Sequence, residues 1–167
     1  LEVTGVVTAV RPDDQYPNFF IQDPQKKEWA GIFVYIPSAY NPTEVGPLVE
    51  ITADIKEYFG LTELANISKT VELSYANTVE PVLIKANALS RGCSYEGEIY
   101  EGMLVRIENI TVATGLNDKD QFSVKDSIDN EVIVDPYLYQ GDWPKSKVGT
   151  IFDSITGVVH YLSLIHI

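Results

Sequence analysis

The sequence predicts an all-β protein made of two tandem five-stranded Greek-key barrels. Short runs of alternating apolar and polar residues recur along the chain, with turn residues between them. Prolines and glycines interrupt the chain before a long helix can form. Three segments also recur in the same order: FFIQDP (19–24) as FSVKDS (122–127), GIFVY (31–35) as EVIVD (131–135), and VGPLVEITADIKEY (45–58) as VGTIFDSITGVVHY (148–161). This order indicates a tandem duplication.

The first unit contains five expected strands. Residues 1–10 are rich in Val and Thr, with a bulge or bend expected at Gly5, and residues 18–36 are expected to form a hairpin whose first arm ends at Asp23-Pro24. Residues 37–47 hold three prolines and a glycine, which favours a loop. A half-buried strand is expected over 48–58, then a turn at Phe59-Gly60, a fifth strand over 61–67, and a short run over 70–74.

The second unit is expected to lack its last strand. Residues 105–114 take the place of its first strand, and the repeat stops at Tyr161. Residues 79–102 are interpreted as a connector that holds a short helix near 86–90. The expected division is therefore 1–78, 79–102 and 103–161. A barrel that lacks a strand exposes an edge and part of its core.

The two ends of the chain suggest a piece of a longer protein. The first residue is Leu1, inside a strand-like pattern. The last six residues, LSLIHI, match the translation of CTG TCT CTT ATA CAC ATC, a transposase adapter used in sequencing libraries. Residues 162–167 are therefore interpreted as adapter read-through, with a native strand as the alternative.

The composition argues against several functions. Twelve basic and 24 acidic residues give a net charge of -12, which disfavours a general phosphate-binding surface. The single cysteine, Cys93, excludes an intrachain disulfide. No apolar run reaches the roughly 18 residues of a membrane span, so no membrane partner is expected.

We expect no enzymatic activity and no cofactor. The sequence has no nucleophile motif, no H-E-x-x-H and no glycine-rich phosphate loop, and His160 is interpreted as a solvent-facing strand residue. Calcium is the alternative, since Asp13-Asp14 and the segment with Asn117, Asp118 and Asp120 offer oxygen ligands. Neither has EF-hand spacing, and solvated turns explain both.

The hairpin over 18–36 has two usable faces. If Phe19, Ile21, Ile32 and Val34 face the core, the opposite face presents Phe20, Phe33 and Tyr35 beside Gln22. That is a large apolar area to leave in water without a purpose.

A long bent first strand and a loop between strands three and four are typical of the OB-fold. The segments GVVTAV, FFIQDP, GIFVY, EYFGLTEL and YEGMLVRIENITV resemble the tandem OB-type domains that accompany endonuclease/exonuclease/phosphatase-type nuclease domains in large secreted bacterial proteins. The resemblance covers nearly all of residues 1–161. It implies a secreted accessory module whose catalytic domain lies elsewhere in the parent chain.

OB-folds bind single-stranded DNA or RNA with aromatic residues on strands two and three and basic residues in nearby loops. The candidates here are Phe20, Gln22, Phe33 and Tyr35 on the strands, Arg11, Lys26, Lys27 and Lys56 for charge, and Trp29, Tyr58 and Phe59 in neighbouring loops. The matching positions of the second unit, Ser123, Lys125, Ile133 and Asp135, cannot stack bases.

The alternative is that the same face packs against the second barrel or another domain. The module would then be a scaffold that spaces and orients neighbouring domains and binds no nucleic acid. The sequence leaves DNA, RNA and polysaccharide open as partners.

Overall fold

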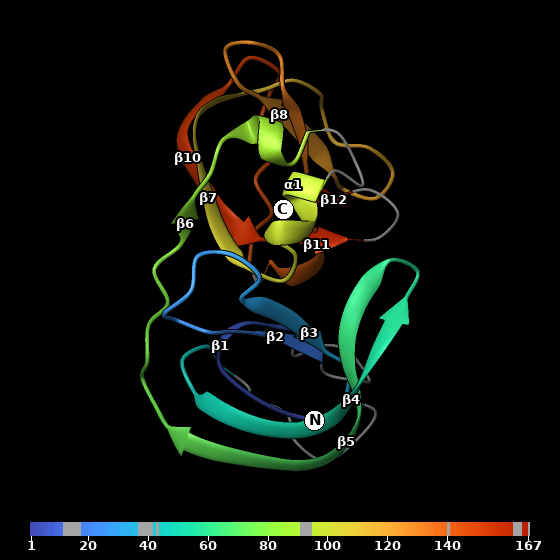
Figure 1. Ribbon diagram of the computed structural model, residues 1–167. Coiled ribbons are helices and arrows are strands. Elements are labelled where there is room, and N and C mark those ends of the chain that lie inside the picture. The colour runs from blue at the N-terminus through green and yellow to red at the C-terminus, as the bar shows by residue number, and fades with distance from the viewer. Residues whose placement is uncertain are drawn as a thin grey trace.

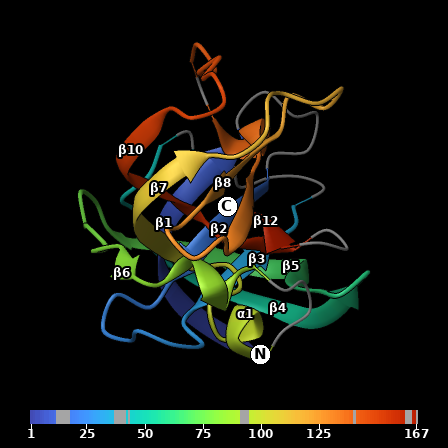
Figure 2. The ribbon, with the colours of Figure 1, turned by 90° about the horizontal axis from the view of Figure 1, so that it is seen from above.

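A computed structural model describes residues 1–11, 18–36, 42, 44–90, 95–139, 141–161 and 165–166, and it is all-β with two sheets. The first sheet is a closed barrel in the order β1-β2-β3-β5-β4, and the second runs β10-β7-β8-β9-β12-β11, with β6 paired to β7. The barrel lies below the second sheet in Figure 1, and from above β7 and β8 lie over β1 and β2 (Figure 2). No described helix has the length and apolar content to cross a membrane.

The strands of the first barrel follow the expected runs. They are β1 Glu2–Arg11, β2 Asn18–Gln22, β3 Gly31–Val34, β4 Leu48–Tyr58 and β5 Leu61–Ser74. The last of these joins two runs that the sequence separated. A bulge at Gly5 is wrong, because the irregularity of β1 lies between Val7 and Ala9, whereas a bend there stays a prediction. Gly5 instead allows close approach, since an added Cβ would lie 3.1 Å from the backbone nitrogen of Gln22.

The inside of the barrel is the face that the alternation predicted. Phe19, Ile21 and Val34 are buried in its core, and Ile32 packs against them. The rest of this core comes from β1, β4, β5 and the residue pair after β3: Val7, Val10, Ile36, Val49, Ile51, Ala53 and Leu64.

The second sheet and its short helices occupy the rest of the chain. They are β6 Val82–Leu83, η1 Ala86–Ala88, α1 Tyr95–Ile99, β7 Leu104–Val112, β8 Phe122–Lys125, β9 Glu131–Val134, η2 Pro136–Leu138, β10 Ile151–Val158, β11 His160–Tyr161 and β12 Ile165–His166.

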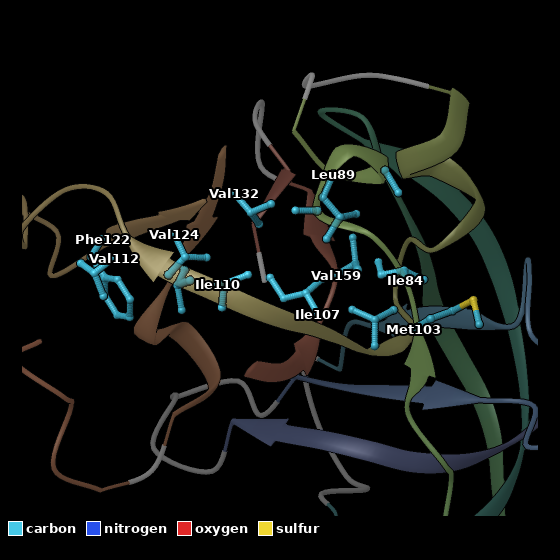
Figure 3. Packing of buried hydrophobic residues seen from close by; sticks show 14 residues of the cluster. Ile84, Leu89, Met103, Ile107, Ile110, Val112, Phe122, Val124, Val132 and Val159 are labelled. Carbon is cyan, nitrogen blue, oxygen red and sulfur yellow. The ribbon is translucent and has the colours of Figure 1, made fainter. Parts of the chain in front are cut away.

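The segment interpreted as a connector, residues 79–102, packs with the second sheet, and the two together are called the second body. Its strand β6 pairs in parallel with β7. Ile84 and Leu89 lie in one buried cluster with Ile107 of β7 and Val132 of β9, as Figure 3 shows. Described residues of this segment, from Val82 to Leu89, therefore help to cover the apolar face of β7.

The two sheets differ at one position. In the barrel, β5 lies between β3 and β4; it pairs with β4 along nearly its whole length and with β3 at Glu63 and Leu64. In the second sheet the two-residue β12 lies between β9 and β11. Among the described residues, β10 pairs only with β7, so its other edge is open.

Candidate functional site

One row of paired residues crosses four strands of the barrel on its outer face. Phe20 pairs with Phe33, Phe33 with Glu63, and Glu63 with Lys56. Directly paired residues on neighbouring strands project from the same side of a sheet. The alternation thus places Phe20 and Phe33 opposite the core, as the sequence predicted.

The expectation that these two rings form an exposed stacking platform is wrong. Phe20 is 0% exposed and Phe33 is 5% exposed. They form one buried cluster with Leu61 and with Val158 of the second sheet. The ring centroid of Phe20 lies 5.0 Å from that of Phe33 and 5.6 Å from that of His160, in an edge-to-face contact. The second sheet covers the face, which was the alternative.

Polar and backbone contacts reinforce this cover. Gln22, expected beside the exposed rings, is 1% exposed, and its Oε1 accepts a hydrogen bond from the backbone nitrogen of Leu104 at 2.7 Å. An added Cβ on Gly31 would lie 2.2 Å from the carbonyl carbon of Gly102, so the two backbones touch. Phe20, Gln22, Gly31 and Phe33 of the barrel and Gly102, Leu104, Val158 and His160 of the second body together make up the junction.

Two further hydrogen bonds link the barrel to the segment before β7. The backbone nitrogen of Trp29 donates to the carbonyl of Ile99 at 2.9 Å, and that of Thr62 donates to Oε2 of Glu101 at 3.3 Å. The other carboxyl oxygen of Glu101 is buried without a hydrogen-bond partner among the described residues. Burial raises the pKa of Glu101 to about 7, and the negative charges of Glu98 and Glu57 raise it as well. The hydrogen bond from Thr62 lowers the pKa but does not offset these effects.

His160 lies inside the molecule, so the solvent-facing interpretation is wrong. It is 6% exposed, and its ring stacks on that of Tyr137 with centroids 4.9 Å apart. The guanidinium of Arg11 lies 4.1 Å from the centre of the same Tyr137 ring, which is a cation–π contact. His160 and Val158 are two residues apart at the end of the β10–β11 run, so both point toward the barrel.

The uncovered part of the outer barrel face forms the floor of a cavity of about 410 Å³. This cavity, the tyrosine pocket, brings together the predicted binding residues Phe33, Tyr35, Lys56 and Tyr58. It is lined by Asn18, Phe33, Tyr35, Lys56, Tyr58, Leu61, Glu63, Ala65, Asn66, Tyr137 and His160. Phe59, at the turn after β4, packs edge-to-face on Tyr58 at 4.7 Å and is 78% exposed.

The polar groups of the tyrosine pocket are mostly acceptors. Asn18 is buried, and its Oδ1 has no hydrogen-bond partner among the described residues. Glu63 is also buried, and desolvation raises its pKa while the charge of Lys56 acts in the opposite direction. Lys56 donates to Oδ1 of Asn66 at 3.4 Å, and Nδ2 of Asn66 donates to Asp54 at 2.9 Å. The main cation near the floor is thus already engaged.

A second cavity, the edge cavity, of about 420 Å³ lies against the open edge of β10. It is mainly apolar and is bounded by β8, β9, η2 and the following loop on one side and by β10 on the other, with Thr8 and Ala9 of the barrel. Its aromatic lining comprises Phe122, Tyr137, Tyr139, Trp143, Phe152 and His160. Tyr137 and His160 line both cavities and so separate them.

The other predicted binding residues lie elsewhere. Lys26, Lys27 and Trp29 belong to the β2–β3 connection and line neither cavity, and Lys26 pairs with Asp23 at 3.3 Å. The sequence reasoning missed Asn18 and Glu63, although both alternate with core residues in their strands. It also missed Tyr137, for which no local pattern gave a signal.

The calcium alternative gains no support. Asp13 and Asp14 lie outside the described residues. Oδ1 of Asn117 accepts hydrogen bonds from the backbone nitrogens of Lys119 and Gln121, as is typical of an Asn that stabilises a turn. The part of the chain that the structure describes contains no group of three or more His, Cys, Asp or Glu placed to hold a metal ion.

Comparison with known proteins gives no further guide: no family model matches the sequence, and no curated protein matches it.

Proposed function

We propose that this chain is a non-catalytic scaffold module in which two OB-like units are fixed to each other and orient the neighbouring domains of a secreted nuclease-like protein. The observation that carries this proposal is the burial of Phe20, Gln22 and Phe33 in the junction. The residues that an OB-type barrel would offer to a single strand are used here to hold the second unit.

In this proposal the second sheet is an OB-like barrel in which the two-residue β12 takes the place of the long closing strand β5. Its order β7-β8-β9-β12-β11 repeats the barrel's order β1-β2-β3-β5-β4, and β9–β12 is a parallel pair as β3–β5 is. The edge cavity lies along β10, whereas the corresponding strand β4 of the barrel pairs with β5 over nearly its whole length. Pairing of Ile165 and His166 uses backbone atoms and fits any sequence, so the adapter interpretation of 162–167 stays a prediction.

Rigid orientation requires close, specific contact, and the junction provides it. The backbone approach of Gly31 to Gly102 leaves no space for a side chain. The bond from Leu104 to Gln22 joins residues 82 positions apart and is buried, where an unmade hydrogen bond is costly. These features favour one fixed arrangement over two loosely tethered units.

A matched pair of glycine substitutions tests the scaffold. Gly31→Ala places a methyl group against the Gly102 backbone, whereas Gly115→Ala meets nothing within 4 Å. We expect Gly31→Ala to let the two units tumble separately or to unfold the second, and Gly115→Ala to behave as wild type. NMR relaxation of amides in each unit reports this directly.

The same samples test single-strand binding. The scaffold predicts no saturable change in fluorescence anisotropy when a labelled single-stranded oligonucleotide is titrated at low salt, with or without calcium. Saturable binding by the wild type, or unchanged common tumbling in Gly31→Ala, would contradict the proposal. In the first case single-strand binding, favoured by the resemblance, would replace it.

A further inference from the structure

The tyrosine pocket has the size and lining of a small-ligand site. Its volume of about 410 Å³ lies within the range of about 300–1,000 Å³ found for ligand pockets. Tyr35 and Tyr58 remain partly exposed at its rim, whereas Phe33 on the same face is buried. The junction thus leaves one part of an aromatic face accessible.

The polar groups indicate what a ligand must bring. Asn18 Oδ1 is a buried acceptor without a partner among the described residues. The buried carboxyl group of Glu63 adds two further oxygens. A buried acceptor left unpaired destabilises the protein, so a ligand that donates a hydrogen bond there gains affinity from it. Lys56 is held by Asn66. The pocket therefore favours a ligand rich in donors over one rich in acceptors.

The surrounding charge disfavours phosphates. Asp54 bonds to Asn66 of the lining, and Glu57 and Glu101 both bond to Thr62, which lies between Leu61 and Glu63 of the floor. Lys56 is the basic residue of the lining, and it is outnumbered by these three carboxylates. The whole chain carries a net charge of -12. A phosphodiester backbone would meet repulsion here, because nucleic-acid affinity depends largely on neutralised phosphates.

The pocket calls for a ligand that packs on an aromatic ring, donates hydrogen bonds and carries no negative charge, and a sugar ring meets all three requirements. Its hydroxyl groups donate hydrogen bonds without bringing charge, and its apolar ring face can lie on an aromatic side chain. We propose that the tyrosine pocket binds one neutral sugar unit of a polysaccharide, with the ring against Tyr58 or Tyr35 and hydroxyl groups directed to Asn18 and Glu63. This site is independent of the scaffold role and would add a glycan attachment point to it.

The test uses the full chain and a panel of neutral oligosaccharides: hexamers of β-1,4-glucan, α-1,4-glucan, xylan and mannan. Calorimetry and amide chemical shifts are recorded up to about 10 mM sugar, which is tenfold above a Kd of about 1 mM, typical of a weak complex. At least one neutral sugar is expected to shift amides of β4 and β5 next to the pocket.

Three variants define the site. Tyr58→Ala removes a rim ring and is expected to weaken binding about tenfold or more. Asn18→Ala removes the buried acceptor and is expected to weaken binding as well, with folding checked by thermal melting. Tyr75→Ala is the matched control, because Tyr75 is 70% exposed and lies outside the pocket, and it should change affinity less than about twofold.

The competing ligands are an oligothymidylate and a polyuronate of similar length. Binding of either at the pocket in place of the neutral sugars overturns the proposal, and so does the absence of pocket shifts with the whole neutral panel. Sugar binding that survives both Tyr58→Ala and Asn18→Ala places the site elsewhere and also overturns it.

Discussion

Phe20→Ala tests how much the junction contributes to stability. Phe20 is fully buried, yet it lies outside the core of the barrel. Its ring packs on Phe33 of the barrel and on Val158 and His160 of the second body. The substitution therefore removes a ring from the contact between two units and leaves both cores intact.

The expected loss follows from the packing of the site. Truncating a buried Phe to Ala costs about 3–5 kcal/mol, and the cost is smaller where the walls can close on the cavity. Because the buried cluster around Phe20 is small, we expect the lower end of this range, about 3 kcal/mol. For a chain of this size 1 kcal/mol corresponds to about 2–4 °C, so the Tm should fall by about 6–12 °C.

Circular dichroism melts and urea titrations measure the change. Phe59→Ala is the control, since Phe59 is aromatic but 78% exposed and should shift stability by no more than about 0.5 kcal/mol. A Phe20→Ala protein that melts like the wild type would refute the contribution of the junction to stability. If the wild type bound a single strand and this variant did not, Phe20 would be a stacking residue.

Three further predictions concern other parts of the molecule. The raised pKa of Glu101 means that the fold binds its proton more tightly than the unfolded chain, so this group stabilises the protein below about pH 4.5 and that contribution is lost as pH rises to about 7. After a discount for solvent screening, the free energy of unfolding should fall by roughly 1 kcal/mol from about pH 5 to about pH 8. Urea titrations at the two pH values measure this difference, and Glu101→Gln should reduce it. A difference that is the same in Glu101→Gln and in the wild type would contradict the assignment. Gln22→Leu leaves the Leu104 amide unpaired and should cost about 1–3 kcal/mol by the same titration, whereas a neutral result would mean that water replaces the bond. The amides of β10 that do not bond to β7 should exchange hydrogen faster than those of β4, and adding a closing strand should protect them; equal protection in both strands counts against an open edge.

The strands and their faces were predictable because they depend on local alternation. Phe19 and Ile21 point inward and Phe20 and Gln22 outward, since successive side chains of a strand take opposite sides. The expected runs of the barrel also fall close to the observed strands, with one turn at Phe59-Gly60 where β4 ends and β5 begins.

The candidate site was predictable only in part. Lys56, Tyr58 and Tyr35 were chosen for their residue types and do line one pocket. Asn18 and Glu63 were missed because a buried polar residue gives no sign in a sequence of whether it will be paired. Lys26, Lys27 and Trp29 were grouped with the others by closeness in sequence, which does not set closeness in space.

The sequence by itself determined an all-β chain and which side of each barrel strand faces the core, because a period of two is a property of the strand alone. It could not determine what covers the outer side. That cover comes from residues more than eighty positions away, Leu104, Val158 and His160, and it depends on how two bodies dock. The same docking buries Phe20 and Phe33, leaves Tyr35 and Tyr58 at a pocket rim, and turns His160 inward. Only the tertiary structure decides these outcomes, since the burial of an outward side chain depends on its neighbours in space and not on its neighbours in the chain.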